Sequence, residues 1–168
     1  ARIYHGPAKQ LGLRSKLHAG LCAPAPEALR LLDGIVDIYV RDMKLRGPRR
    51  WSLLPRPRLR RGQPGVGDGD ARQVRDLALD SDGIARRGLL MRHLVLPSDL
   101  AGTREVTGFL RRAVSTETAV NLMHQYHPCY RADGYPPLDR PLSLAGYDRA
   151  LAEARDAGLH RSGGARRR

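Results

Sequence analysis

Polar side chains follow two runs of residues that the sequence predicts to be strands. Asp42 and Lys44 follow residues 35–40, and Gln125 and Tyr126 follow a later run. A lysine can pair with a carboxylate, and an aspartate can hold that lysine or bind a cation. Glutamine and tyrosine offer donors and acceptors to a substrate or to the backbone of a loop. Each pair therefore has two interpretations. Asp42 and Lys44 form a ligand site or a surface ion pair, and Gln125 and Tyr126 bind a ligand or hold the long loop by polar contacts.

His93 and the two cysteines are the other candidates for chemistry. His93 alternates with Arg92 in a predicted strand, so only one of them can face a given side of the sheet. A single histidine on a strand is either a binding residue or a hydrogen-bonded part of the core. Cys22 and Cys129 are far apart and form no disulfide framework, which favours a reducing cytoplasm. Cys129 could be redox-active, but the favoured interpretation is a small buried hydrophobe.

The elements that position these residues alternate between helix and strand. The sequence predicts helices at 26–33, 103–114 and 143–157, and strands at 35–40, 89–96 and 118–124. Such alternation is typical of βαβ units and a parallel sheet. Three strands are few for a parallel sheet that must be covered on both faces. We therefore expect an α/β fold of about three βα units that forms part of a (β/α) barrel of the TIM type.

Helix ends and faces follow from residue types. Gly34 suits the left-handed stop of the first helix, Thr103 suits the N-cap of the second, and Ser143 suits the N-cap of the third. Residues 80–83 have the composition of a turn. The apolar faces of the two later helices are predicted to contain Val106, Phe109, Leu110, Ala113 and Val114, and Leu144, Tyr147, Leu151 and Ala154.

The positive charge is concentrated in two segments. The chain has a formal net charge of +13, of which residues 45–72 carry +6 and the tail, residues 161–168, carries +4. Residues 45–72 are rich in Arg, Pro and Gly, which predicts a disordered basic insert. A basic run without a recognition motif is usually a solvated segment, so the charge argues against specific nucleic-acid binding. The sequence contains no run of about 18 apolar residues, so it predicts no membrane span, and it shows no secretory signal at its start.

Three stretches resemble one family. They are residues 27–44 (EALRLLDGIVDIYVRDMK), 82–97 (DGIARRGLLMRHLVLP) and 120–130 (VNLMHQYHPCY). They look like the later strands of radical SAM proteins of the pyruvate formate-lyase-activating type, and the last helix fits the same family. The resemblance implies a partial barrel over residues 26–160 with its chemistry at the carboxyl ends of the strands, where barrel enzymes place their sites. Residues 1–25 stay unassigned.

The resemblance also implies a cofactor and a partner. The related activases place an Asp-x-Lys where Asp42 and Lys44 stand, beside S-adenosylmethionine, and His93, Gln125 and Tyr126 are further candidates near it. The family cleaves S-adenosylmethionine with a [4Fe–4S] cluster held by Cys-x3-Cys-x2-Cys, and generates a radical on a protein or small-molecule substrate. Cys22 and Cys129 cannot supply three thiolates. We therefore expect a carboxy-terminal half that is inactive alone.

Three alternatives stay open from the sequence. The chain is a fragment, one half of a split enzyme whose cluster half is encoded separately, or a small basic protein that binds RNA or DNA through its arginine-rich segments. A steep loss of affinity with salt would mark the last of these.

The basic insert has a further interpretation as out-of-frame family sequence. Codons can be chosen for residues 51–71 that, read one base forward, encode an amphipathic stretch with Val-Asn-Arg and Glu-Met. Loss of the helix that this stretch would form is expected to expose apolar surface and to favour aggregation.

The coding DNA tests this interpretation. We expect a reading-frame slip after about Lys44 that is restored near Arg72, and a three-cysteine motif upstream. An intact frame, without an insertion or deletion relative to close relatives, would remove the idea and would favour the binding-protein alternative.

Overall fold

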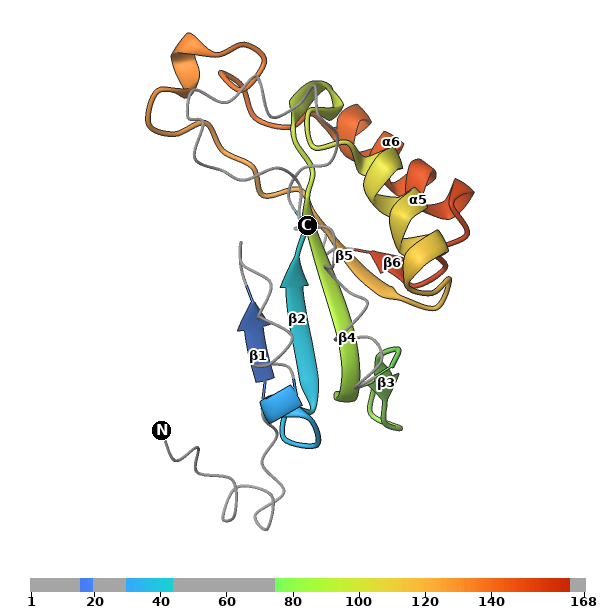
Figure 1. The fold of residues 1–168 in the computed structure, drawn as a ribbon. Coiled ribbons are helices and arrows are strands. Elements are labelled where there is room, and N and C mark those ends of the chain that lie inside the picture. The colour runs from blue at the N-terminus through green and yellow to red at the C-terminus, as the bar shows by residue number, and fades with distance from the viewer. Residues whose placement is uncertain (1–15, 20–29, 44–74, 164–168) are drawn as a thin grey trace.

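The computed structural model describes residues 16–19, 30–43 and 75–163. Five parallel strands lie side by side in an open α/β sheet (Figure 1). Their order across the sheet is β1 (Lys16–Ala19), β2 (Ile38–Asp42), β4 (Ala85–Leu94), β5 (Ala119–Met123) and β6 (Ser162–Gly163). A short strand, β3 (Ala78–Leu79), pairs antiparallel with the start of β4.

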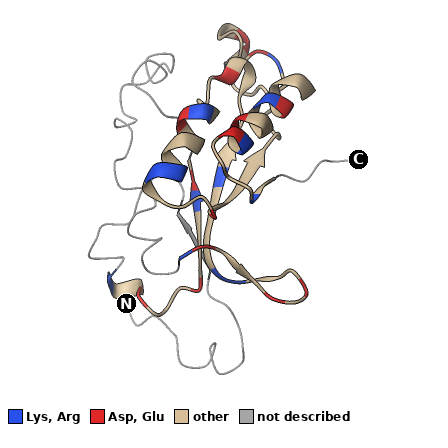
Figure 2. Cartoon of the chain, turned by 90° about the vertical axis from the view of Figure 1, so that its right-hand side faces the viewer, with Lys and Arg blue, Asp and Glu red and all other residues tan. Residues whose placement is uncertain are grey.

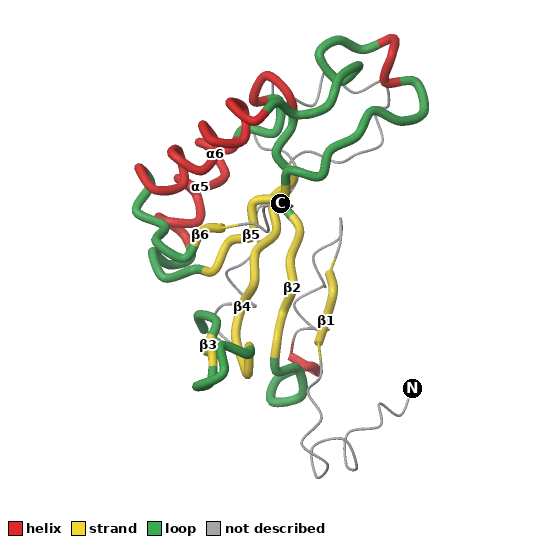
Figure 3. The backbone as a smooth tube through the Cα atoms, turned by 180° about the vertical axis from the view of Figure 1, so that it is seen from behind, coloured by secondary structure: helices red, strands yellow, loops and turns green. Residues whose placement is uncertain are grey.

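Two helices cover one face of this sheet. They are α5 (Thr103–Ala113), between β4 and β5, and α6 (Leu144–Asp156), between β5 and β6 (Figures 1 and 3). The described residues thus contain the units β4–α5 and β5–α6. Two short 3₁₀ helices, η1 (Pro97–Asp99) and η2 (Ala132–Gly134), lie in the loops that follow β4 and β5.

The core lies between the sheet and these helices. Apolar side chains of the three middle strands and of the residue after β4 form one cluster with those of α5 and α6. From the sheet side it includes Tyr39, Leu89, Met91, Val95, Val120 and Leu122, and from the helices Val106, Leu110, Tyr147 and Ala154. Burial of a large apolar side chain contributes roughly 1.5–3 kcal/mol, so this layer is the main source of stability. The Tyr147 hydroxyl donates a hydrogen bond of 3.0 Å to the Leu122 carbonyl, which fastens α6 to β5.

Most predicted elements are present with shifted ends. The predicted strands 35–40 and 118–124 are β2 and β5 at residues 38–42 and 119–123, and the predicted strand 89–96 is β4 at 85–94. β4 begins earlier because the predicted turn at 80–83 is real and joins it to β3. In that turn the Asp80 carboxylate accepts the amides of Asp82 and Ile84 at 3.0 and 2.8 Å. The predicted stop at Gly34 is confirmed by its φ of 70°.

The prediction that Thr103 is the N-cap of α5 was wrong. Gly102, with a φ of 70°, is the N-cap, and the Thr103 amide donates to the Asp99 carboxylate at 3.0 Å. The predicted cap of α6 is confirmed, because the Ser143 hydroxyl accepts the Gly146 amide.

Two positions on the predicted apolar faces were wrong. Leu144 is 82% exposed, because it stands in the first turn of α6, beyond the edge of the sheet. Ala113 is also exposed, while Thr103 and Thr107 fill buried positions of α5 instead. Their hydroxyl groups are tolerated because each has a partner; Thr107 donates to the Thr103 carbonyl at 2.9 Å.

Several predictions lie outside the described residues. These are the basic insert at 45–72, most of segment 1–25, the first half of the predicted helix at 26–33 and most of the tail at 161–168. In the described part of the chain, no helix is long and apolar enough to cross a membrane.

Gly88 allows two segments of backbone to approach closely. Its φ is 128°, its amide donates to the Asp37 carbonyl at 2.8 Å, and a Cβ there would collide with the backbone of Asp76 and Leu77. We expect Gly88→Ala to lower the free energy of unfolding by about 3 kcal/mol, because it adds both strain and overlap. Gly134→Ala, where a Cβ meets open space, is the control and should change it by less than about 0.5 kcal/mol. Urea denaturation measures both; equal effects would contradict the close approach.

Candidate functional site

The clearest polar contact in the sheet joins the carboxyl ends of β2 and β4. Asp42 and Arg92 stand opposite each other in the parallel register. The Arg92 Nε donates to the Asp42 Oδ1 at 2.6 Å, and the Met43 amide donates to the Arg92 carbonyl at 2.8 Å. The Asp42 side chain is 10% exposed and that of Arg92 is 32% exposed. This ion pair is therefore half-enclosed and still open to a ligand from one side.

Asn121 extends this pair across the sheet. It stands opposite Arg92 in the β4–β5 register and is half-buried. We call Asp42, Arg92 and Asn121 the polar row. Met91 precedes Arg92 and Val120 precedes Asn121, and both Met91 and Val120 belong to the core. Because side chains alternate along a strand, the polar row lies on the face of the sheet opposite to α5 and α6.

The polar row has the chemistry of a site for a charged small molecule. The hydrogen bond to Asp42 is the main cause that raises the pKa of the Arg92 guanidinium, so the guanidinium stays charged. A guanidinium has five donors and binds carboxylates or phosphates in a bidentate manner, and a carboxylate binds an ammonium group or a cation. The row could thus hold a molecule that carries both signs of charge.

His93 lies on the other face of β4. It is 1% exposed, its Nδ1 lies 2.7 Å from the Met43 carbonyl, and its Nε2 lies 3.1 Å from the Thr103 hydroxyl. A carbonyl can only accept, so Nδ1 carries the proton and Nε2 accepts from Thr103 in the neutral ring. Burial lowers the pKa of His93, against the opposing effect of the Met43 carbonyl. The structure thus gives His93 the contacts of a core residue that joins β2, β4 and α5.

The two candidates after β5, Gln125 and Tyr126, make different contacts. Gln125 is exposed, with its side-chain nitrogen 3.8 Å from the Met123 sulfur. Tyr126 donates its hydroxyl hydrogen bond to the Leu138 carbonyl at 2.8 Å, and burial is the main cause that raises its pKa. Tyr126 therefore holds the loop from residue 124 to 143, while Gln125 stays available at the end of the strand.

Lys44 and Cys129 are the two remaining candidates. Lys44 lies outside the described residues. The prediction that Cys129 is buried was wrong, because Cys129 is exposed in the loop after β5. Within residues 16–19, 30–43 and 75–163, no three His, Cys, Asp or Glu side chains gather to hold a metal ion.

Sequence reasoning missed Arg92 and Asn121 as site residues. It noted that only one of Arg92 and His93 can face a given side of the sheet, and it named His93 as the candidate. No signal in the sequence marks Arg92: it lies two residues before the end of β4 and stands opposite Asp42, the last residue of β2. Register between strands decides this pairing, and register is not written in either strand alone.

One comparison with known proteins gives a match. The chain is 29% identical over 133 residues to the uncharacterized protein MJ0674 of Methanocaldococcus jannaschii. That match covers 74% of this chain and 33% of the relative, so the chain spans about a third of the length of the protein it matches. No family model and no solved structure matches the chain.

The buried contacts of His93 predict a specific pH dependence. Its pKa is lowered from 6.5 in the folded state, so the unfolded chain takes up a proton first as the pH falls. The stability contributed by neutral His93 is complete above about pH 6.5 and is lost as the pH falls towards the lower folded value. We expect His93→Gln to be less stable at pH 7.5 and to lose less further stability between pH 7.5 and 5.5. Urea denaturation at several pH values measures this, and an unchanged pH dependence in the variant would contradict it.

Proposed function

We propose that this chain is the carboxy-terminal part of a radical SAM enzyme that resembles pyruvate formate-lyase-activating proteins, and that its polar row faces S-adenosylmethionine. The observation that carries the proposal is the contact between Asp42 and Arg92 at the carboxyl ends of adjacent parallel strands. Each residue belongs to a stretch that resembles this family, and the two stretches meet at the edge of the sheet where α/β enzymes bind their ligands.

The residues of the polar row fit the methionyl part of S-adenosylmethionine. That part carries an ammonium group and a carboxylate on one carbon atom. Asp42 would receive the ammonium, and the guanidinium of Arg92 would receive the carboxylate together with Lys44. Asn121 offers an amide donor and acceptor on the same face, and the exposed Gln125 offers another shortly after β5. The 32% exposure of the Arg92 side chain leaves room for such an approach.

The iron–sulfur cluster does not fit the residues of this chain. Its ligation needs closely placed thiolates, and the chain has two cysteines, Cys22 and Cys129, which are 107 positions apart in the sequence. In the intact family, such a cluster would supply the electron for reductive cleavage of S-adenosylmethionine. This chain would supply binding and orientation through its polar row, and the cluster would be held by another part of the protein or by a second chain.

The arrangement of the strands supports a partial barrel of the TIM type. Parallel strands with helices on one face are the building pattern of (β/α) barrels, in which the other face points inward. On that face the chain presents the polar row. A third βα unit and the remaining strands would complete the barrel.

The nucleic-acid alternative has less support from the described residues. In Figure 2 the ribbon of the two helices carries both basic and acidic positions, which are interspersed along the sequences of α5 and α6. The arginine-rich segments that suggested it lie almost wholly outside the described residues. A surface of one sign is what nucleic-acid binding requires, and these helices do not provide one.

Binding of S-adenosylmethionine by the chain tests the proposal. We expect saturable binding in equilibrium dialysis, weakened roughly tenfold to a hundredfold by Arg92→Gln, because a hydrogen bond to a charged group contributes about 1.5–3 kcal/mol. Arg111→Gln, in the exposed last turn of α5, is the control and should bind as the wild type does. Loss of binding in both variants alike, or no binding by the wild type, would reject the proposal.

A further inference from the structure

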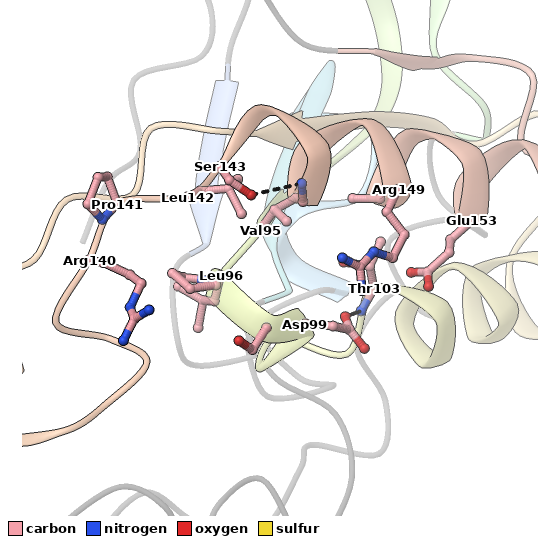
Figure 4. Close-up of a pocket in the computed structure, with 14 residues that line it drawn as sticks. Val95, Leu96, Asp99, Thr103, Arg140, Pro141, Leu142, Ser143, Arg149 and Glu153 are labelled. Atoms are coloured by element: carbon pink, nitrogen blue, oxygen red, sulfur yellow. Dashed lines mark hydrogen bonds between the residues drawn. The ribbon is translucent and has the colours of Figure 1, made fainter.

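A pocket of about 340 Å³ lies on the helix side of the sheet, away from the polar row. It opens between the carboxyl end of β4, η1 and the first turns of α5 and α6 (Figure 4). Its apolar wall is formed by Val95, Leu96, Pro97, Leu142 and Ala150. Its volume lies at the lower end of the range of small-molecule sites, and about half of its lining residues are polar or charged.

Opposite charges stand side by side in this pocket. Arg149 and Glu153 are four residues apart on α6 and so share one face of the helix, with about 5–6 Å between their Cβ atoms. Figure 4 shows both side chains extending from α6 toward η1. Arg149 is exposed, whereas Glu153 is 9% exposed.

Glu153 is poorly compensated for a buried carboxylate. Its nearest ion-pair partner, Arg104, lies at 3.6 Å, beyond hydrogen-bond length, and the Arg104 side chain is 71% exposed. Burial is the main cause that raises the pKa of Glu153, and the neighbouring charge of Asp99 adds to it, while the charges of Arg104 and Arg149 offset this only in part. A cation placed inside the pocket would relieve both effects.

The floor of the pocket is a strained turn that places a second carboxylate. Ser98 and Asp99 have φ values of 53° and 55°, a left-handed conformation that is costly for residues other than glycine. One oxygen of Asp99 accepts the Thr103 amide at 3.0 Å and starts α5. Because Asp99 also lines the pocket, the negative side contains two carboxylates.

The positive side contains Arg149 and the start of α6. Ser143, the N-cap of α6, lines the pocket, and the first turn of a helix carries partial positive charge. An anionic group placed there would meet the Arg149 guanidinium as well. The pocket thus offers a cation site and an anion site a few ångströms apart, beside an apolar wall.

We propose that this pocket binds a small dipolar molecule of the apolar α-amino-acid class. Its ammonium group lies at Glu153 and Asp99, its carboxylate lies at Arg149 and the start of α6, and its side chain lies against Val95 and Leu142. An α-amino acid carries both charges on one carbon atom, which matches the adjacent positions of Glu153 and Arg149. This inference does not depend on the proposed radical SAM function, because the pocket and the polar row lie on opposite faces of the sheet.

Titration calorimetry of the full chain tests the inference with matched probes. These are L-leucine, 4-methylpentanoate, which lacks the ammonium group, and 3-methylbutylamine, which lacks the carboxylate. We expect saturable binding of L-leucine and at least about tenfold weaker binding of the other two, because each loses a charged hydrogen bond. Equal binding of all three probes would overturn the proposal, as would the absence of saturable binding for L-leucine, L-valine and L-phenylalanine alike.

Variants of Glu153 and Arg149 test which residue binds the ammonium group and which binds the carboxylate of the ligand. Glu153→Gln should weaken L-leucine about tenfold and leave 4-methylpentanoate unchanged, while Arg149→Gln should weaken both molecules by a similar factor. Arg155→Gln, at an exposed position in the last turn of α6, is the matched control and should bind L-leucine as the wild type does. Circular dichroism checks that each variant folds, and Arg149 is exposed, so its replacement leaves the core intact. Binding that is unchanged in both pocket variants would overturn the assignment.

Discussion

The two-residue alternation along β4 is the constraint on which the rest of this structure depends. This strand is hydrogen-bonded to β2 on one side and to β5 on the other. In its carboxyl-terminal half the odd-numbered residues Leu89, Met91 and His93 are buried on the side of α5 and α6, and Arg92 lies on the opposite face. A shift of one residue in register would bury the Arg92 guanidinium and expose the core, so this pairing is strongly specified.

Parallel pairing then concentrates the polar groups at one edge of the sheet. The carboxyl ends of β2, β4 and β5 lie together, so Asp42, Arg92 and Asn121 meet although they are far apart in the sequence. The turn after β4 reaches the same edge on the helix side and forms the floor of the pocket. His93 stabilises this edge by joining the end of β2 to the start of α5 with two buried hydrogen bonds. One end of the sheet thus carries both candidate sites on a shared rigid support.

The sequence predicted the elements better than the contacts between them. Hydrophobic period and turn residues located β2, β4, β5, α5 and α6 to within a few residues, because these signals are local. The N-cap of α5 was misplaced because Gly102 adopts a left-handed conformation and Asp99 caps the helix from the preceding turn. Leu144 was assigned to the core from its helical spacing, but the end of the sheet decides which turns of α6 are covered.

The candidate site was only partly predictable for a similar reason. Asp42, Gln125 and Tyr126 were identified by their positions after strands, while the partner of Asp42 follows from the register between β2 and β4. From the sequence alone, His93 and Tyr126 could each be either a binding residue or a structural residue. Their hydrogen bonds to the Met43 and Leu138 carbonyls show the structural contacts that they make. These carbonyls are backbone groups, so no residue type in the sequence could have revealed them.

Amide chemical-shift mapping with S-adenosylmethionine tests the central claim most directly. The ligand is added to the ¹⁵N-labelled chain, and the affected residues are located on the two faces of the sheet. The proposed role of the polar row predicts saturable shifts at Asp42, Arg92 and Asn121, with smaller changes at α5 and α6. Shifts confined to the helix side of the sheet, or none at all, would contradict it.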